Sequence, residues 1–180
     1  LTTSLRDNTT RPPPRTKPSS TPSPSSTPFP SSGSEATTSV NLAVTLSAAS
    51  GQTVTVNYAE TGGMATSPAD YTISGTQLTF APGVTSQNVP ITVVNDALDE
   101  ADETIIVTLS SPTNATLGAN TTHTYTINDD DAAPTVQFTS ASGSGSESVT
   151  SVNIPVSLSV ASGQTVTVQY AVTGGTATGG

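Results

Sequence analysis

Two short stretches of the chain hold most of its carboxylates. Eight of the 13 acids lie within residues 95–103 and 129–131, whereas all four bases lie in the first 17 residues. Two carboxylates about 5 Å apart repel by roughly 3 kcal/mol at an effective dielectric near 20. A folded cluster of these acids therefore needs a cation. With no Cys and a single His in the chain, oxygen ligands predict a hard ion, and many carboxylates favour calcium over magnesium.

Competing chemistries fail on composition or spacing. The run from Asp129 lacks the Gly at the sixth position and the Glu at the twelfth that an EF-hand loop requires. The chain has no Walker loop, no G-x-S-x-G elbow and no H-E-x-x-H motif. His123 is the only histidine, Trp is absent and aromatics make up 4% of residues, which leaves neither a triad nor a sugar platform. We therefore expect the protein not to be an enzyme.

Strict alternation of apolar and polar residues predicts the elements that must position the acids. From Ser39 onward, Val40, Leu42, Val44 and Leu46 occupy one face of a half-buried strand. The same period recurs near residues 54–58, 89–93, 105–109 and 125–127, with shorter strands at 71–73 and 78–80. Gly and Pro fall between these runs as turn residues, and no segment has helical periodicity. About seven strands in about 100 residues are typical of an antiparallel β-sandwich, so we predict an all-β fold.

The chain repeats itself. At an offset of 112, residues 33–66 match residues 145–178 at 25 of 34 positions, including the shared run Ser-Gly-Gln-Thr-Val-Thr-Val at 50–56 and 162–168. This identity indicates a tandem array of one module. We expect a first domain at 33–131 and a partial second domain at 132–180, truncated before it completes its own sandwich.

The N-terminal segment has a different composition. Residues 11–32 are dominated by Pro, Ser and Thr, with too few apolar groups to offset chain entropy, so we expect 1–32 to be a disordered linker. The second copy has a plausible opening strand at 134–138, where the first copy has residues 22–26, Pro-Ser-Pro-Ser-Ser. Because proline and serine are poorly suited to a central strand, we expect an open edge there. The first residue is Leu, which suggests that the start of the gene product is missing.

The net charge of the chain argues against nucleic acid and anionic membranes as partners. The formal net charge is −9, and no Lys or Arg follows residue 17. A surface of this sign repels phosphate backbones and anionic lipid, so we expect no nucleic-acid partner. No apolar run approaches 18 residues, so we expect no direct insertion of this segment into a membrane.

Several runs within residues 33–131 form one pattern: residues 58–66, the Asp70-Tyr71 step, 78–83, the acid loop 93–104, 107–110 and the exit 127–131. Together, and in register, they resemble the Calx-β module. The resemblance implies an immunoglobulin-like antiparallel β-sandwich that, in sodium–calcium exchangers, binds several calcium ions at one end. Asn95 departs from the acid of the calcium-sensing members, which puts one ion position in doubt. Carried over by position, the implied metal ligands are Glu35, Asp70, Asp96, Glu100, Glu103, Asp129, Asp130 and Asp131. We expect Asp99, Asp102 and Glu60 to lie in solvent.

The function that follows is a calcium-binding repeat module of an extracellular or cell-surface protein, with an adhesive or spacer role stiffened by Ca2+. Abundant Ser, Thr, Gly and Asn with almost no Lys resemble secreted or surface-displayed bacterial repeat proteins. The expected partners are calcium ions and neighbouring Calx-β repeats, and a surface or matrix protein or a glycan stays open. The alternatives are a calcium-independent structural stalk and a regulatory calcium-sensor module of a membrane protein.

Overall fold

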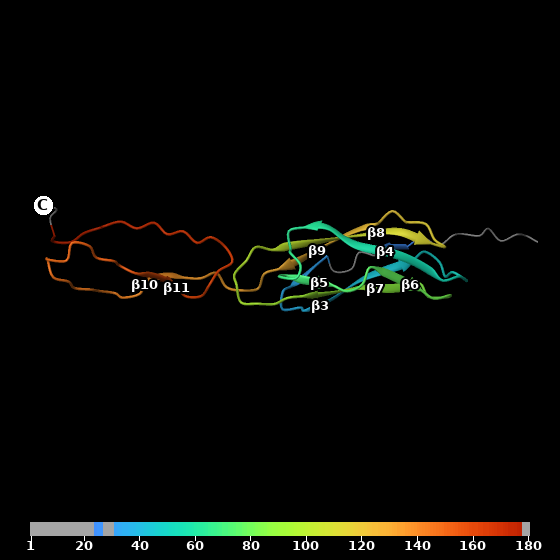
Figure 1. Ribbon diagram of the computed structural model, residues 1–180, viewed down its shortest axis with the longest axis horizontal. Coiled ribbons are helices and arrows are strands. Elements are labelled where there is room, and N and C mark those ends of the chain that lie inside the picture. The colour runs from blue at the N-terminus through green and yellow to red at the C-terminus, as the bar shows by residue number, and fades with distance from the viewer. Residues whose placement is uncertain (1–23, 27–30, 178–180) are drawn as a thin grey trace, which may run out of the picture.

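The computed structural model describes residues 24–26 and 31–177, and it is built from strands alone in that part of the chain (Figure 1). None of these residues forms a helix of the length and apolar character that crossing a membrane requires. The all-β prediction is confirmed. The strands are β1 (Pro24–Ser26), β2 (Ser32–Ser34), β3 (Ser39–Leu46), β4 (Val54–Gly63), β5 (Tyr71–Ile73), β6 (Gln77–Phe80), β7 (Ser86–Val93), β8 (Glu103–Thr113), β9 (Thr122–Asn128), β10 (Val136–Phe138) and β11 (Val156–Leu158).

Two sheets form the first domain. One has the order β1-β3-β7-β5 and the other the order β2-β9-β8-β4-β6. Neighbouring strands are antiparallel except for β2, which runs parallel to β9. Figure 1 shows the two layers lying face to face. The first domain is therefore the β-sandwich that the alternation predicted.

The alternating residues supply the core between the sheets. Strand β3 buries every second side chain, and β7 does the same from Val89 to Val93. The largest fully buried side chains are Tyr71, Tyr125 and Phe80. Period-2 patterning places one face of each strand inward, so burial of that face holds the layers together. One cluster of buried side chains spans both sheets.

Strand β1 corrects the expectation of an open edge. Pro24, Ser25 and Ser26 pair with Leu46, Thr45 and Val44 of β3, so this part of the edge is covered. The second copy uses the same register at the offset of 112, with Val136 opposite Leu158 and Phe138 opposite Val156. A proline was unsuitable only for a central strand. At the first residue of an edge strand it is tolerated, because one side of such a strand donates no ladder hydrogen bonds.

The second copy has strands but no core in the described residues. Its paired strands β10 and β11 form a two-stranded sheet. After β11 the chain turns at Ser162 beside the sandwich and then runs away from it as an extended loop (Figure 1). Most of its apolar side chains are exposed, including Phe138, Ile154, Val168 and Tyr170. The apolar side chains that form the core in the first domain therefore have no opposing sheet to pack against in the second copy.

Strand direction brings the acidic segments to one end of the sandwich. The start of β3 lies beside the end of β7, since Ser39 pairs with Thr92. The start of β8 lies beside the end of β9, since Glu103 pairs with Ile127. The loop between β7 and β8 and the exit from β9 therefore meet at this end, while the turn from β3 to β4 lies at the other.

Candidate metal centre

Separate segments deliver carboxylates to one pocket at this end. Glu35 follows β2, Asp70 precedes β5, the acid loop joins β7 to β8, and Asp129 follows β9. Apolar walls come from Val94 and Ile127. Six of the eight predicted ligands line the pocket: Glu35, Asp70, Asp96, Glu100, Glu103 and Asp129.

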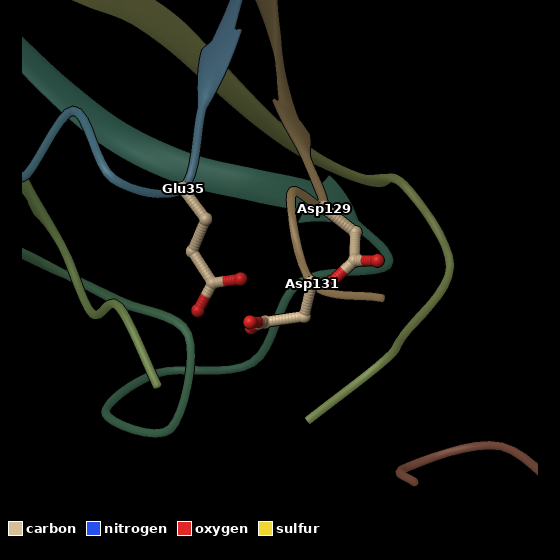
Figure 2. A group of neighbouring side chains, drawn as sticks. All are labelled: Glu35, Asp129 and Asp131. Atoms are coloured by element: carbon tan, nitrogen blue, oxygen red, sulfur yellow. The ribbon is translucent and has the colours of Figure 1, made fainter. Parts of the chain in front are cut away.

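Three carboxylates come close enough to share one ion. Glu35, Asp129 and Asp131 each offer an oxygen, and these oxygens lie within 4.8 Å of one another. Figure 2 shows the Asp131 carboxylate directed toward that of Glu35, with Asp129 beside it at the end of β9. Asp131 is thus the seventh predicted ligand that the structure brings to the site.

Two oxygens of this group lack hydrogen-bond partners. Asp129 Oδ1 and Asp131 Oδ2 are both buried and neither accepts a hydrogen bond. A buried polar group left unsatisfied costs about 1–3 kcal/mol, and a charged group costs more. A cation would satisfy both atoms at once. Because every available donor is a carboxylate oxygen, the residues present fit a hard ion such as calcium.

Glu35 is the buried member of the group, with 7% of its surface exposed. Its Oε1 accepts a hydrogen bond of 2.9 Å from the backbone N–H of Asp96, and its own N–H donates to the carbonyl of Asn128 at 2.9 Å. These bonds tie the start of the acid loop to the side chain of Glu35 and the end of β9 to its backbone. Burial raises the pKa of Glu35, and the charges of Asp96, Asp131 and Asp129 raise it further, although the Asp96 N–H opposes them.

Neighbouring backbone orients two further carboxylates. Asp70 Oδ2 accepts from the N–H of Thr66 at 2.6 Å and from its hydroxyl at 2.8 Å. The carbonyl of Asp70 accepts from the N–H of Val94 at 2.9 Å, which joins this loop to the end of β7. Asp96 Oδ1 accepts from the N–H of Leu98 at 2.8 Å. Each side chain is thus held in place through one oxygen.

The pKa values of two glutamates are raised because the carboxylates of the cluster are partly buried and repel one another without a cation. The pKa of Glu103 is raised to about 7, first by burial and then by a hydrogen bond to Asp70 and the charges of Asp70, Glu100 and Glu35. Burial also raises the pKa of Glu100, and the charges of Asp96 and Asp70 act in the same direction. The cluster therefore retains protons that isolated carboxylates would lose.

Asp130 is not brought into this group. It is exposed, and its Oδ2 accepts from the hydroxyl of Ser34 at 2.8 Å. It does not line the pocket. Of the eight predicted ligands, it is the one that the structure places apart.

Of the three acids expected in solvent, Asp102 and Glu60 are exposed and Asp99 is half-buried, and each also has a partner in the domain or the second copy. Asp102 Oδ1 accepts from the N–H of Asp129 at 3.1 Å, and so supports the exit segment. Asp99 contacts Ser162 of the second copy. Glu60 shares a hydrogen bond with the hydroxyl of Tyr71, whose pKa is raised first by burial and then by this bond. Thr66 was not identified from the sequence as a residue that supports the site. Its position four residues before Asp70, whose carboxylate it contacts, was the available signal.

A family match covers both copies of the repeat. The Calx-beta domain matches residues 27–131 and again residues 129–180. No curated protein matches the chain. Together the two matched segments cover well over half of the sequence.

Solved structures agree with the domain match. The chain is similar to the structure titled CBD12 from CALX1.2, with 26% identity and a TM-score of 0.58 over 66% of this chain and 48% of that one. It is also similar to the apo-form Calx CBD1 domain, with 25% identity and a TM-score of 0.58 over 62% of this chain and 100% of that one. A structure titled calcium binding domain CBD12 of CALX1.1 matches at 26% identity and a TM-score of 0.57, over 65% and 48% of the two chains. The chain spans about half the length of both CBD12 structures. It belongs to the Calx-beta domain family.

Proposed function

We propose that the first domain is a calcium-binding module. The observation that carries the proposal is the pair of buried, unpartnered oxygens, Asp129 Oδ1 and Asp131 Oδ2, in a group with Glu35 whose ligand oxygens lie within 4.8 Å of one another. Neutralising two carboxylates that each have a buried, unpartnered oxygen, with no base nearby, requires a cation or protons. At neutral pH and millimolar calcium the cation is the stronger candidate.

Each residue has a role in this proposal. Glu35, Asp129 and Asp131 hold the ion, and Asp70, Asp96, Glu100 and Glu103 supply further oxygens from the pocket wall. When bound, the ion supplies the positive charge that the domain lacks. Asp102 and Thr66 act as positioning residues, because they hold Asp129 and Asp70 in place.

Calcium would stabilise the end of the sandwich where the chain segments meet. The ligands come from the ends of β2, β7 and β9 and from the starts of β5 and β8. A shared ion links these segments, and any ligand that binds only the folded state raises the free energy of unfolding. The CALX1.1 structure, whose title describes a calcium binding domain, supports this assignment by similarity.

The module's setting is a tandem array in an extracellular or cell-surface protein, where it acts as an adhesive or spacer element. Support comes from the internal repeat, from the Pro/Ser/Thr-rich segment before the domain and from a body without Lys or Arg. The partners are calcium and neighbouring Calx-beta repeats. Any adhesive contact is with a surface or matrix protein or a glycan.

Calorimetric titration of calcium into the full chain tests the assignment. We expect saturable binding to the natural chain and loss of most of the heat in the double variant Asp129→Asn/Asp131→Asn, which keeps side-chain shape but removes charge. Asp130→Asn is the matched control, because Asp130 bonds Ser34 outside the pocket. Absence of binding heat in the natural chain would leave a calcium-independent stalk. Equal loss in both variants would move the site toward Asp130.

A further inference from the structure

The second copy touches the acid loop of the first through a single turn. Asp99 and Ser162 form a parallel β-bridge. The Ser162 hydroxyl lies 3.0 Å from Asp99 Oδ2 and 3.2 Å from the Asp99 carbonyl, and the N–H of Gly163 donates to that carbonyl at 3.1 Å. The contact therefore uses one side chain and the backbone of the turn.

Gly163 leaves room for this contact. A Cβ at this position would lie 2.5 Å from Oε1 of Glu100, and the three heavy atoms nearest to it all belong to Glu100. Its φ is outside the left-handed region that favours glycine. The neighbour that crowds Gly163 thus belongs to the preceding copy.

The first copy carries the same turn, and its Ser50 carbonyl accepts a hydrogen bond of 2.8 Å from the N–H of Gly83, but no described residue lies against Gly51. Gly51 occupies the equivalent position, has no left-handed φ, and would place a Cβ in open space. The turns also share their internal geometry, because the Gln52 N–H donates to Ser50 Oγ at 3.0 Å and the Gln164 N–H donates to Ser162 Oγ at 3.1 Å. Neither crowding within its own copy nor backbone conformation accounts for a glycine at 51.

The two surfaces lie at opposite ends of one module. The acid loop joins β7 to β8 at the metal end, and the Ser50–Gly51 turn joins β3 to β4 at the other end. A contact between two different surfaces of identical units is heterologous, so it can extend from copy to copy without closing on itself.

We propose that the Ser50–Gly51 turn is a docking surface for the acid loop of another copy of this module. The Ser50 hydroxyl would donate to the carboxylate equivalent to Asp99 while it accepts from Gln52, as a hydroxyl can do both. The N–H of Gly51 would donate to the carbonyl of the same aspartate. This inference deepens the proposed array function and rests on it for the identity of the partner.

Cysteine cross-linking tests the proposal, because the natural chain has no Cys. In the full chain, Asp99→Cys/Ser162→Cys first checks the observed contact, since bridge-paired residues have Cα atoms within the span of a disulfide. A chain with Asp99→Cys and Gly163→Val then offers an acid loop freed from its own second copy. Mixing it with a Ser50→Cys chain should give the mixed disulfide several-fold faster than mixing it with a Ser86→Cys chain. Ser86 is exposed and lies at the same end of the sandwich.

Each outcome decides the question. Faster trapping at Ser50 supports docking, and equal rates at Ser50 and Ser86 overturn it. Failure of the intrachain pair to cross-link overturns it as well. If Gly163→Val unfolds the chain, Ser162→Ala serves as the second way to free the loop. The rates are measured in chelator, so a negative result leaves calcium binding untouched, and calorimetry alone decides the latter.

Discussion

The two copies share most of their residues over 34 aligned positions yet differ in burial. Val44 is 2% exposed and its counterpart Val156 is 48% exposed, while Tyr58 is 4% exposed and Tyr170 is 93% exposed. The strand β3 has β7 beside it and the five-stranded sheet against it, whereas β11 has only β10. Alternation therefore specifies which face could be buried. Burial itself requires the opposing layer, which β8 and β9 largely supply.

The acidic residues show the same difference. Glu35 and Glu147 occupy equivalent positions, but Glu35 is buried and Glu147 is exposed. The acid loop and the β9 exit surround Glu35, and residues 132–177 contain no equivalent of either segment. A ligand set distributed over several loops forms only when the strands between those loops have paired.

Paired core substitutions should sharpen the comparison most. Leu46→Ala should lower the free energy of unfolding by about 2–5 kcal/mol, because it removes a buried side chain and leaves a cavity. Leu158→Ala, at the equivalent exposed position, should change it by less than about 0.5 kcal/mol. Chemical denaturation of the full chain measures both. Similar losses in the two variants would mean that the second copy also has a packed core.

Substitutions of two equivalent glycines, one in each copy, test whether the backbone is closely packed in the first copy and open in the second. Gly63 has a φ of 126°, and a Cβ there would lie 2.0 Å from the carbonyl oxygen of Thr104. Gly63→Ala should therefore cost about 1–3 kcal/mol. Gly175 has a φ of 135° but open space around it, so Gly175→Ala should leave the unfolding of the first domain unchanged. A harmless Gly63→Ala would contradict the close approach of β4 to β8.

The pH dependence of the free energy of unfolding should also differ between variants of the two copies, by less than the core and glycine substitutions do. Folding raises the pKa of Glu103 from about 4.5 to about 7, so the folded state binds more protons between these values. In chelator, the free energy of unfolding should therefore fall as pH rises from about 4.5 to 7, by about 1 kcal/mol for Glu103, since solvent screens a half-exposed side chain. Glu103→Gln should flatten this slope, and Glu147→Gln should not. A slope unaffected by Glu103→Gln would remove Glu103 from the cluster.

Much of the fold was predictable because apolar alternation survives in each main strand of the first domain. Strand β3 is an example, since its buried positions are those that the sequence marks from Val40 to Leu46. Strand β1 was missed, because Pro24–Ser26 carries no apolar pattern and is held by backbone pairing to β3. Pairing of this kind depends on the neighbour's free edge, which a local pattern does not encode.

The site was predictable in residue type but not in every side-chain direction. The structure brings Glu35, Asp70 and Asp129 together at one end, as the resemblance implied, because strand ends fix where each segment begins. Within a loop no period determines which carboxylate faces inward. Asp102 turns to the Asp129 backbone, Asp99 to the second copy, and Asp130 to Ser34. The last two contacts join residues more than 60 positions apart, so sequence spacing gave no sign of them.

Thermal unfolding with and without calcium tests the central claim most directly. If the first domain binds calcium with a Kd of about 10⁻⁴ M, near the range of extracellular modules, then 10 mM calcium is about 100 Kd and adds roughly 2.7 kcal/mol. For a domain of about 100 residues this corresponds to a rise in Tm on the order of 10 °C. The Asp129→Asn/Asp131→Asn variant should lose most of that rise. An identical Tm for the natural chain in chelator and in 10 mM calcium would contradict the account.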